Sequence, residues 1–288
     1  MRQAFGAVRT RLAGKQLIPI LSGVLLATAR KAVMNVLKSQ ILSLAVLLFA
    51  APSALAQNAT PGTSPSTALE NCRALQSAGV ALSGTYWIRP GGGAPFTAYC
   101  DMETNGGGWT LVYNSILGIN TTDFWNISYW ERFNRRGRPS LESLFYDGSL
   151  YQHGTAYMDV IEDLRGKSVV AMVATTTGID NYSMKFNSPQ YVSGYWGIFS
   201  AQFASGWASP DFDGDAYVGY NCATSYMNVT QHYGSCWYYN LGSDGDAPGE
   251  DGRVGPHLNS SAAAYMGLSI DGSGGYFTRV RRISRFVK

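Results

Sequence analysis

The sequence predicts a mixed α+β domain with short helices and long loops, and three observations support this fold class. Short apolar or alternating segments are bounded by Gly and Pro turns, long helical periodicity is almost absent, and the chain beyond Phe203 consists mostly of Gly, Asp, Ser and Tyr. Of the 288 residues, 45% are hydrophobic and only 14% are charged. This composition supports a buried core and argues against a disordered chain or a coiled coil.

The first expected element is a short helix over residues 71–79, because Cys72, Leu75 and Gly79 fall near one face. Turns rich in Gly and Pro at residues 90–93 and 106–108 then separate short β-segments. We expect strands at residues 84–88, 95–102, 109–113, 169–175, 182–186 and 277–286. Most of the remaining chain is predicted to form loops, which carry binding residues more often than strands do.

The positive charge of the chain is concentrated in its first 56 residues. The formal net charge is +3, yet residues 1–56 contain seven Lys and Arg and no Asp or Glu. The other 232 residues therefore hold 15 of the 22 basic groups and all 19 acidic groups, a net charge of −4. Once the N-terminal segment is set apart, the net charge no longer indicates an anionic binding partner.

The N-terminal segment has the pattern of a secretory signal peptide. Met34 begins a short basic stretch, residues 41–49 are apolar, and Ala54 and Ala56 stand at the −3 and −1 positions of a cleavage site. We expect residues 1–56 to be the signal region, with Met34 as the true start and cleavage after Ala56. An uncleaved membrane anchor is the alternative, but the apolar run is shorter than the about 20 residues that a span needs. A second apolar segment at residues 17–29 is the alternative for the part before Met34.

The remaining chain is expected to be extracellular, with a flexible linker at residues 57–68, rich in Pro, Ser and Thr, before a compact domain at residues 69–288. All four cysteines follow Ala56, and export predicts two disulfides, for which the count alone leaves three pairings open. No C-x-x-C motif supports a redox or zinc site. Six glycosylation sequons begin at Asn58, Asn120, Asn126, Asn181, Asn228 and Asn259.

Two sets of residues carry a resemblance to a known family. The first set is Cys72, Gly79, Ser83-Gly84, Tyr86, Ile88, Pro90, Cys100-Asp101-Met102 and Gly106-Gly107-Gly108-Trp109-Thr110. The second set is Asn221-Cys222-Ala223, Cys236 and Asn240-Leu241, after which Gly242-Ser243 replaces the expected Asn-Gly. Together they resemble the fibrinogen C-terminal (fibrinogen-like) domain family over about residues 69–288. The segment 106–112 is also similar to the intelectins, but those proteins carry more than four cysteines.

The resemblance implies a three-part α+β fold. Its parts are a small disulfide-bonded N-terminal subdomain, a central mixed or antiparallel sheet, and a loop-rich subdomain that binds calcium and ligand. It also implies the disulfides Cys72–Cys100 and Cys222–Cys236, which spacing favours as well because both close local loops. Each disulfide is expected to contribute about 3–4 kcal/mol to stability.

The sharpest chemical motif is the alternation of Asp211, Asp213 and Asp215 along one loop. Carboxylate oxygens on a curved loop are the hard ligands that Ca²⁺ prefers. An EF-hand is excluded because Ala216 and Cys222 occupy its positions 6 and 12 and no helical pattern flanks the loop. The motif predicts a calcium site, with a solvated acidic turn as the alternative.

The resemblance assigns the calcium ligands residue by residue. It implies the carboxylates of Asp213 and Asp215 and the backbone carbonyls of Tyr217 and Gly219. One extra residue before the cysteine leaves Asp211 as a further candidate ligand. A second acidic cluster at residues 244–251 is either another calcium site or a surface loop, since acidic groups so close repel one another without a cation.

The resemblance also places a ligand site beside the calcium loop, at an unusual cis peptide that here falls between Ser235 and Cys236. Aromatic faces and nearby N–H and O–H groups suit acetylated sugars, although aromatic side chains that simply fill the core are an equal alternative. The expected ligand-binding residues are Tyr226, His232, Tyr233, Ser235, Cys236, Trp237 and Tyr238.

The sequence favours a binding module over an enzyme. Only three His are present, and no nucleophile motif, zinc-protease motif or phosphate-binding loop occurs. A basic stripe from Arg279 to Lys288 predicts a solvated edge strand or a contact with an anionic glycan, while the net charge disfavours nucleic acid. Two hypotheses remain, a secreted calcium-dependent lectin and an extracellular adhesion or matrix module that binds a protein. No collagen-like or heptad stalk is present, so the oligomeric state stays open.

Overall fold

The computed structural model describes residues 59–117, 122–242, 255–268 and 277–288, which belong to a unit that begins at Ala59. The expected signal region, the second acidic cluster at 244–251 and the sequons at Asn58 and Asn120 lie outside the described residues. None of the described helices combines the length and the hydropathy that a membrane span requires.

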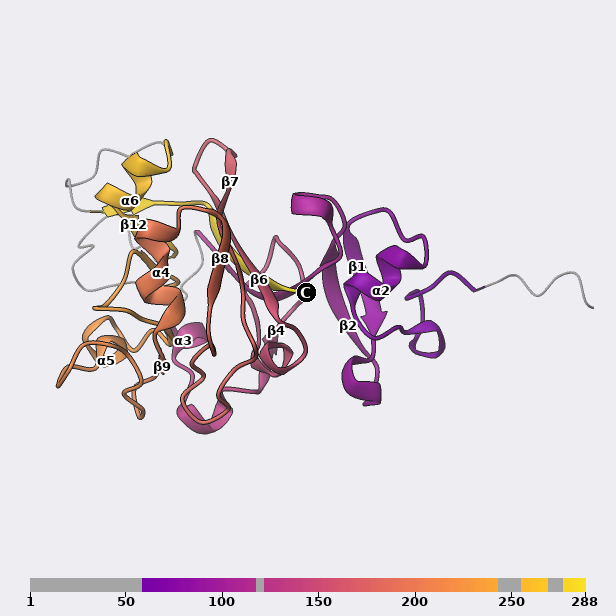
Figure 1. Cartoon of the computed structure of the whole chain (residues 1–288), viewed down its shortest axis with the longest axis horizontal. Helices are drawn as coiled ribbons and strands as arrows, with labels where there is room; N and C mark the ends of the chain where they lie inside the picture. The colour runs from indigo at the N-terminus through magenta and orange to yellow at the C-terminus, as the bar shows by residue number, and fades with distance from the viewer. Residues whose placement is uncertain (1–58, 118–121, 243–254, 269–276) are drawn as a thin grey trace, which may run out of the picture. The chain divides into compact units, whose positions relative to one another are not determined.

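A nine-stranded antiparallel sheet organises the chain (Figure 1). The C-terminal strand β14 lies in its middle, hydrogen-bonded to β3 on one side and β6 on the other. The main path of the sheet is β1 (Gly84–Ile88), β2 (Phe96–Asp101), β3 (Trp109–Ile116), β14 (Arg282–Val287), β6 (Ala156–Glu162), β7 (Ser168–Thr175) and β8 (Gln190–Gly194), with β5 (Phe145–Asp147) beside β3 and β4 (Arg135–Gly137) beside β5. The chain end is thereby fixed at the centre of the fold.

The N-terminal subdomain forms where the turn residues predict it. Helix α2 (Cys72–Ser77) begins at Asn71, whose side chain accepts a hydrogen bond from the Ala74 amide at 2.9 Å. The turn into β3 needs glycine at position 107, where φ is +65° and a Cβ atom would lie 2.1 Å from the Met102 carbonyl oxygen. The predicted helix and the first three predicted strands are confirmed within a few residues.

The described part of the segment that we expected to be a linker is hydrogen-bonded to this subdomain. The Gly62 carbonyl accepts a hydrogen bond from the Trp87 amide at 2.8 Å, and Leu69 forms a parallel bridge with Ile88. A short 3₁₀ helix, η1 (Pro65–Thr67), lies between these contacts. Residues 59–68 therefore pack against β1.

Side chains from successive sheet residues enter two hydrophobic clusters, because a strand directs them alternately to its two faces. Tyr157 belongs to the larger cluster and Met158 to a smaller one on the other face. In the larger cluster Phe186 stacks on Phe203 with ring centroids 4.2 Å apart. Phe203 comes from helix α4 (Trp196–Ala204), which packs on β7.

The rest of the described chain is built from short elements around long loops, as expected beyond Phe203. The remaining strands are β9 (Trp207–Ala208), β10 (Gln231–His232), β11 (Tyr239–Asn240), β12 (His257–Asn259) and β13 (Phe277–Arg279). The remaining helices are α3 (Thr122–Trp125), α5 (Cys222–Ser225), α6 (Ser260–Tyr265), η2 (Pro90–Gly92), η3 (Thr104–Gly106), η4 (Tyr129–Glu131) and η5 (Gly148–Gln152).

Three expectations about elements are wrong. The predicted strand at 182–186 is a series of turns, because Met184 adopts a φ of +55° and only Phe186 forms a single bridge, to Ile179. The predicted strand at 277–286 is divided into β13 and β14, which pair with different partners. The final strand is central, so the expectation that its basic residues mark a sheet edge is also wrong.

Candidate functional site

Two disulfides join the segments that the resemblance placed together. Cys72 is bonded to Cys100, and Cys222 to Cys236, with Cα–Cα distances of 5.4 and 5.5 Å. The second disulfide connects the start of α5 with the loop that precedes Trp237. It therefore holds the acidic loop and the aromatic segment at one site.

Helix α5 is fixed at its first residues by two side chains. Asn221 caps the helix by accepting a hydrogen bond from the Thr224 amide at 3.1 Å, and its own side-chain amide donates to the Ser209 carbonyl at 2.9 Å. One oxygen of Asp215 accepts a hydrogen bond from the Cys222 amide at 2.8 Å, and the other accepts from the Tyr217 amide at 2.7 Å. Asp215 thus ties the acidic loop to the disulfide.

The acidic loop concentrates negative charge without a basic side chain of its own. Partial burial raises the pKa of Asp215 above its ordinary value, the nearby Asp213 raises it further, and hydrogen bonds from the Cys222 and Tyr217 amides oppose the shift. Residues 205–242 contain no Lys or Arg. Asp213 and Asp215 repel one another, and no basic side chain in this segment offsets their charge. Such paired carboxylates are common in sites that bind a cation.

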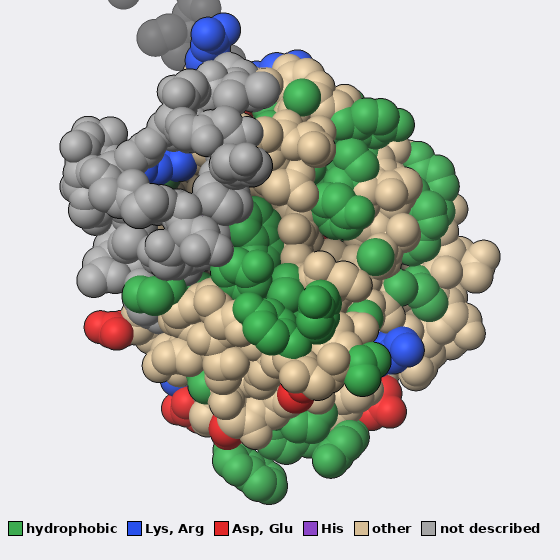
Figure 2. All heavy atoms as spheres, turned by 90° about the vertical axis from the view of Figure 1, so that its left-hand side faces the viewer, with side chains coloured by type: hydrophobic (Ala, Val, Ile, Leu, Met, Phe, Trp, Pro, Cys, Tyr) green, Lys and Arg blue, Asp and Glu red, His purple; other side chains and the backbone are tan. Residues whose placement is uncertain are grey.

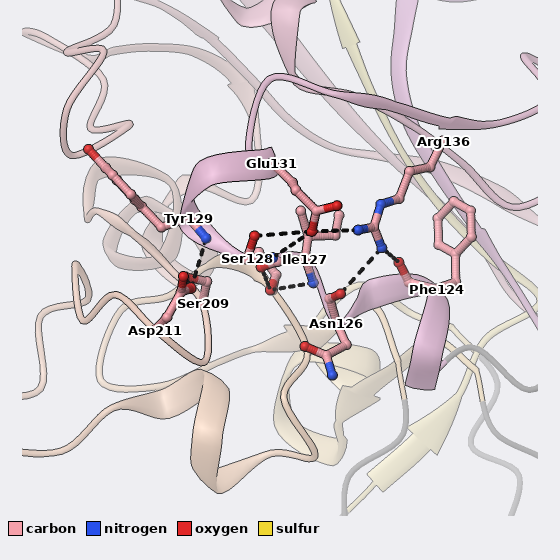
Figure 3. A network of polar contacts seen from close by, with 10 residues as sticks. Phe124, Asn126, Ile127, Ser128, Tyr129, Glu131, Arg136, Ser209 and Asp211 are labelled. Carbon is pink, nitrogen blue, oxygen red and sulfur yellow. Dashed lines mark hydrogen bonds and ion pairs between the residues drawn. The ribbon is translucent and has the colours of Figure 1, made fainter.

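Asp211 has a different environment from Asp213 and Asp215. Its Oδ1 accepts hydrogen bonds from the Tyr129 amide and the Ser209 hydroxyl, both at 2.8 Å (Figure 3). Over the described ranges, no three His, Cys, Asp or Glu side chains converge as a metal site. The Asp211 carboxylate consequently holds η4 in place instead of completing a three-carboxylate cluster.

The other expected calcium ligands lie on the same loop as Asp213 and Asp215. Gly219 has a φ of +77°, which permits the turn there, and the Tyr217 carbonyl accepts a hydrogen bond from the Tyr220 amide at 3.2 Å. Carboxylate and backbone carbonyl oxygens are hard donors, of a kind that fits Ca²⁺ better than a thiolate- or imidazole-binding metal.

Four of the expected ligand-binding side chains lie at least partly at the surface. Ser235 is exposed, and the half-buried rings of Tyr226 and Trp237 meet edge to face with centroids 5.7 Å apart. Tyr238 is half-buried as well, and its amide donates to the side-chain oxygen of Gln202 at 2.8 Å. On the face of the molecule that carries α5, Figure 2 shows hydrophobic side chains gathered near the middle and acidic ones along the lower edge.

Three other expected ligand-binding residues are buried. Cys236 is 6% exposed, in the disulfide, and Tyr233 is fully buried with its hydroxyl donating to the Val229 carbonyl at 2.6 Å. His232 is 2% exposed and stacks on Phe186 with centroids 4.8 Å apart. The side chains of His232 and Tyr233 therefore fill the interior beneath the loop instead of facing a ligand.

The environment of His232 fixes its neutral form. Burial, and to a lesser degree the charge of Arg285, lower the pKa of His232 from 6.5 to about 3. Its Nε2 donates to the Met184 carbonyl at 2.8 Å, so its Nδ1 is the acceptor for the Arg285 guanidinium at 3.2 Å. His232 is a structural link between the sheet and the loop subdomain.

Sequence reasoning missed the buried ion pair that His232 contacts. Arg285, which we had assigned to a basic stripe, is fully buried and donates from Nε and NH2 to the two oxygens of Asp159 at 2.6 and 2.7 Å. Its NH2 also donates to the Tyr239 hydroxyl at 2.8 Å. No local signal could identify this pair, because its members are 126 residues apart in the chain.

Comparisons with known proteins agree with this architecture. The family model described as the C-terminal globular domain of fibrinogen beta and gamma chains matches residues 68–251. Human Ficolin-3 is 30% identical over 230 residues, which cover 75% of this chain and 70% of the relative. Veficolin-1 of Varanus komodoensis is 38% identical over 66 residues, which cover 23% of this chain and only 28% of the relative.

A solved structure shares the fold. The fibrinogen-like globe domain of human ANGPTL6 superposes with a TM-score of 0.53 at 21% identity, covering 76% of this chain and 95% of that domain. The fold, the two disulfides and the extent of the family match lead to one conclusion: the chain belongs to the fibrinogen C-terminal domain family.

Proposed function

We propose that this protein is a secreted, calcium-dependent recognition module that binds acetylated sugars or other glycans beside its acidic loop. One observation carries the proposal. Asp215 accepts a hydrogen bond from the Cys222 amide, and the disulfide from Cys222 leads to Cys236 and directly on to Trp237. A cation on the loop and a ligand on the aromatic segment would therefore act on one connected site.

Calcium would be held by the carboxylates of Asp213 and Asp215 together with the backbone carbonyls of Tyr217 and Gly219. Partial burial is the main cause that raises the pKa of Asp215, and the negative charge of Asp213 raises it further. A bound divalent cation would neutralise this charge and fix the loop against α5. This role also explains why the loop needs no basic side chain of its own.

The aromatic segment would supply the ligand surface. The half-buried rings of Tyr226 and Trp237 can cover the apolar face or the acetyl methyl of a sugar, while the exposed Ser235 offers a hydroxyl. The relatedness to human Ficolin-3 supports a glycan as the ligand class. The family is generally one of recognition modules, and we propose binding without catalysis here.

Two features support export to an oxidising environment. All four cysteines are paired in disulfides, which persist mainly outside the cytosol. The sequence pattern of residues 34–56 is that of a signal peptide. We propose that the folded domain acts outside the cell.

A glycan screen with and without a calcium chelator tests the proposed function. We expect the wild type to bind acetylated glycans only when calcium is present, and both Asp215→Asn and Trp237→Ala to lose most of the signal. Leu82→Ala is the matched surface control, because Leu82 is 72% exposed and belongs to the N-terminal subdomain. Chelator-independent binding would contradict the calcium requirement, and the absence of any glycan signal would contradict the lectin assignment.

A protein-binding adhesion module is the second candidate function, favoured by an exposed apolar loop. Val218 is 99% exposed between the partly exposed Tyr217 and Tyr220. Such a tip suits the apolar centre of a protein interface. Recovery of one extracellular partner by the wild type but not by Val218→Asp, without glycan binding, would favour this candidate.

A further inference from the structure

An aromatic cluster with two exposed rings is built around η4, next to Asp211. Trp130 is 82% exposed and Tyr182 is 68% exposed, and both rings meet the ring of Tyr129 edge to face, with centroids 5.3 and 5.9 Å away. Tyr129 in turn stacks on Phe212 with centroids 4.4 Å apart. We call these four residues, Tyr129, Trp130, Tyr182 and Phe212, the aromatic platform.

The platform stands on a hydrogen-bonded base, drawn in Figure 3. Ser128 and Glu131 form a capping box around η4, and Glu131 also pairs with Arg136 at 2.8 Å. The buried Thr230 hydroxyl accepts a hydrogen bond from the Ile127 amide at 3.2 Å and donates one to the Ile127 carbonyl at 2.8 Å, which fixes the segment that precedes η4. The backbone that carries Trp130 is therefore positioned before any ligand arrives, which lowers the entropic cost of binding.

Arg132 contacts the platform and links its two segments. Its guanidinium lies 3.9 Å from the centroid of the Tyr129 ring and donates to the Tyr129 carbonyl at 2.8 Å. Its other nitrogens donate to the Asn181 carbonyl at 3.1 and 3.2 Å. These bonds join the segment of Tyr182 to η4, so the two exposed rings belong to one unit.

The platform is connected through hydrogen bonds to the proposed calcium and glycan site. The Tyr129 amide donates to Asp211, which also accepts from the Ser209 hydroxyl, and the Ser209 carbonyl accepts from Asn221 at 2.9 Å. Asn221 directly precedes Cys222, whose amide donates a hydrogen bond to the Asp215 carboxylate at 2.8 Å. One series of hydrogen bonds therefore joins the platform to the acidic loop and the second disulfide.

We propose that the platform is a second sugar subsite, at which a further ring of an uncharged oligosaccharide stacks on Trp130 and Tyr182. This inference rests on the proposed glycan-binding function. The C–H face of a pyranose ring is apolar, whereas its edge carries hydroxyl groups. The exposed polar residues beside the platform, Asp180, Asn181 and Asp211, are suited to hydroxyl groups.

The charge and size of the platform favour an uncharged sugar over other ligands. The carboxylates of Asp180 and Asp211 accept hydrogen bonds from the Tyr182 and Tyr129 amides, so negative charge near the platform would repel sulfated or acidic sugars. The positive charge of Arg132 is already directed to the Tyr129 ring and to two carbonyls. Two exposed rings surrounded by polar groups match one sugar unit better than the far larger contact area that a stable protein interface requires.

Calorimetric titration with N-acetylglucosamine and with its β1,4-linked tetramer, in calcium, tests the inference. We expect the wild type to bind the tetramer more tightly than the monosaccharide. Trp130→Ala should weaken tetramer binding about tenfold and leave monosaccharide binding unchanged, while Trp130→Phe, which keeps a ring, should retain most of the affinity. Tyr265→Ala is the matched control, since Tyr265 is 66% exposed on α6, and it should change neither affinity.

The outcomes separate this inference from the function on which it rests. Monosaccharide binding by the wild type, with equal tetramer affinities for the wild type and Trp130→Ala, would overturn the subsite and leave the proposed function intact. A wild type that binds neither sugar would overturn both. An unfolding midpoint of Trp130→Ala equal to that of the wild type establishes that the variant is folded, so that a selective loss of tetramer binding supports the subsite.

Discussion

The buried ion pair Arg285–Asp159 and the acidic pair Asp213–Asp215 on the surface loop differ in how their charges are balanced. The first pair joins opposite charges at the centre of the sheet, where each charged atom of Arg285 has a partner within about 3.2 Å. The second pair joins like charges on a loop that carries no basic residue. The fold offsets the charge of the first pair by itself, and the second pair is where we propose that a cation binds.

This difference shows that a cluster of charge in the sequence does not by itself identify a binding site. The basic residues of the last strand and the acidic residues of the loop are both clusters, yet Arg285 is completely buried. What distinguishes the two regions is whether partners from the same chain are within hydrogen-bonding distance. Substitutions that remove those partners are therefore the direct way to test the comparison.

The largest loss of stability is expected for Arg285→Ala. It leaves Asp159 as an unpaired charge in the core and also removes a donor from Tyr239 and from His232. We expect the free energy of unfolding to fall by about 3–5 kcal/mol, measured by urea denaturation at constant calcium concentration.

A shape-matched double substitution is the control for this prediction. Replacing both charges, in Asp159→Leu with Arg285→Met, should cost less stability than Arg285→Ala alone, because no charge remains buried without its partner. A loss below about 1 kcal/mol for Arg285→Ala would contradict the view that the core depends on this pair.

A smaller, pH-dependent effect is expected from His232. Its pKa of about 3 in the folded protein lies below 6.5, so the stability it contributes is complete above pH 6.5 and is lost as the pH falls toward 3. We expect the free energy of unfolding to fall by about 1.4 kcal/mol per pH unit between pH 5.5 and 4.5 from this group. Urea denaturation at the two pH values measures it.

The variant His232→Gln isolates this contribution from the carboxylates that titrate in the same range. Gln keeps a donor for the Met184 carbonyl but cannot take up a proton. The wild type should therefore lose more stability than His232→Gln over the interval. Parallel pH profiles for the two proteins would mean that His232 does not stay neutral in the folded state.

The smallest loss of stability is expected for Arg281→Ala, because Arg281 is the more exposed counterpart of Arg285. Arg281 is about half exposed and forms ion pairs with Glu162 at 3.0 Å and Glu142 at 3.7 Å. Glu162 is buried but keeps Arg282 as a second ion-pair partner at 2.5 Å, and water and salt screen the charge of Arg281. We therefore expect a loss below about 1 kcal/mol by urea denaturation. A loss as large as that of Arg285→Ala would remove the distinction between buried and exposed charge in this C-terminal segment.

Local signals sufficed to predict the N-terminal subdomain but not the centre of the fold. The glycine turns define β1, β2 and β3, and the family resemblance gave the two disulfide pairings. Helix α4 was not predicted for two reasons. Its N-cap residue, Tyr195, makes no capping side-chain hydrogen bond, and its apolar residues lack a clear helical periodicity. Strand β14 was expected at an edge, because its central position depends on pairing with β3 and β6 far away in the chain.

The same division applies to the candidate site. The alternation of aspartates identified the acidic loop, but the different environment of Asp211 depends on the Tyr129 amide, 82 residues away. Composition alone could not separate His232, which is buried, from Trp237, which is partly exposed. Aromatic residues indicate a ligand surface only after the fold shows which rings reach solvent.

A calcium titration followed by unfolding tests the central claim, that the acidic loop beside the second disulfide binds calcium. At a calcium concentration 100 times the dissociation constant, we predict that calcium raises the free energy of unfolding of the wild type by about 2.7 kcal/mol. Asp213→Asn and Asp215→Asn should lose this gain, whereas Asp211→Asn should keep it, since Asp211 is bonded to η4. Equal stabilisation of the wild type and Asp215→Asn by calcium would contradict the claim.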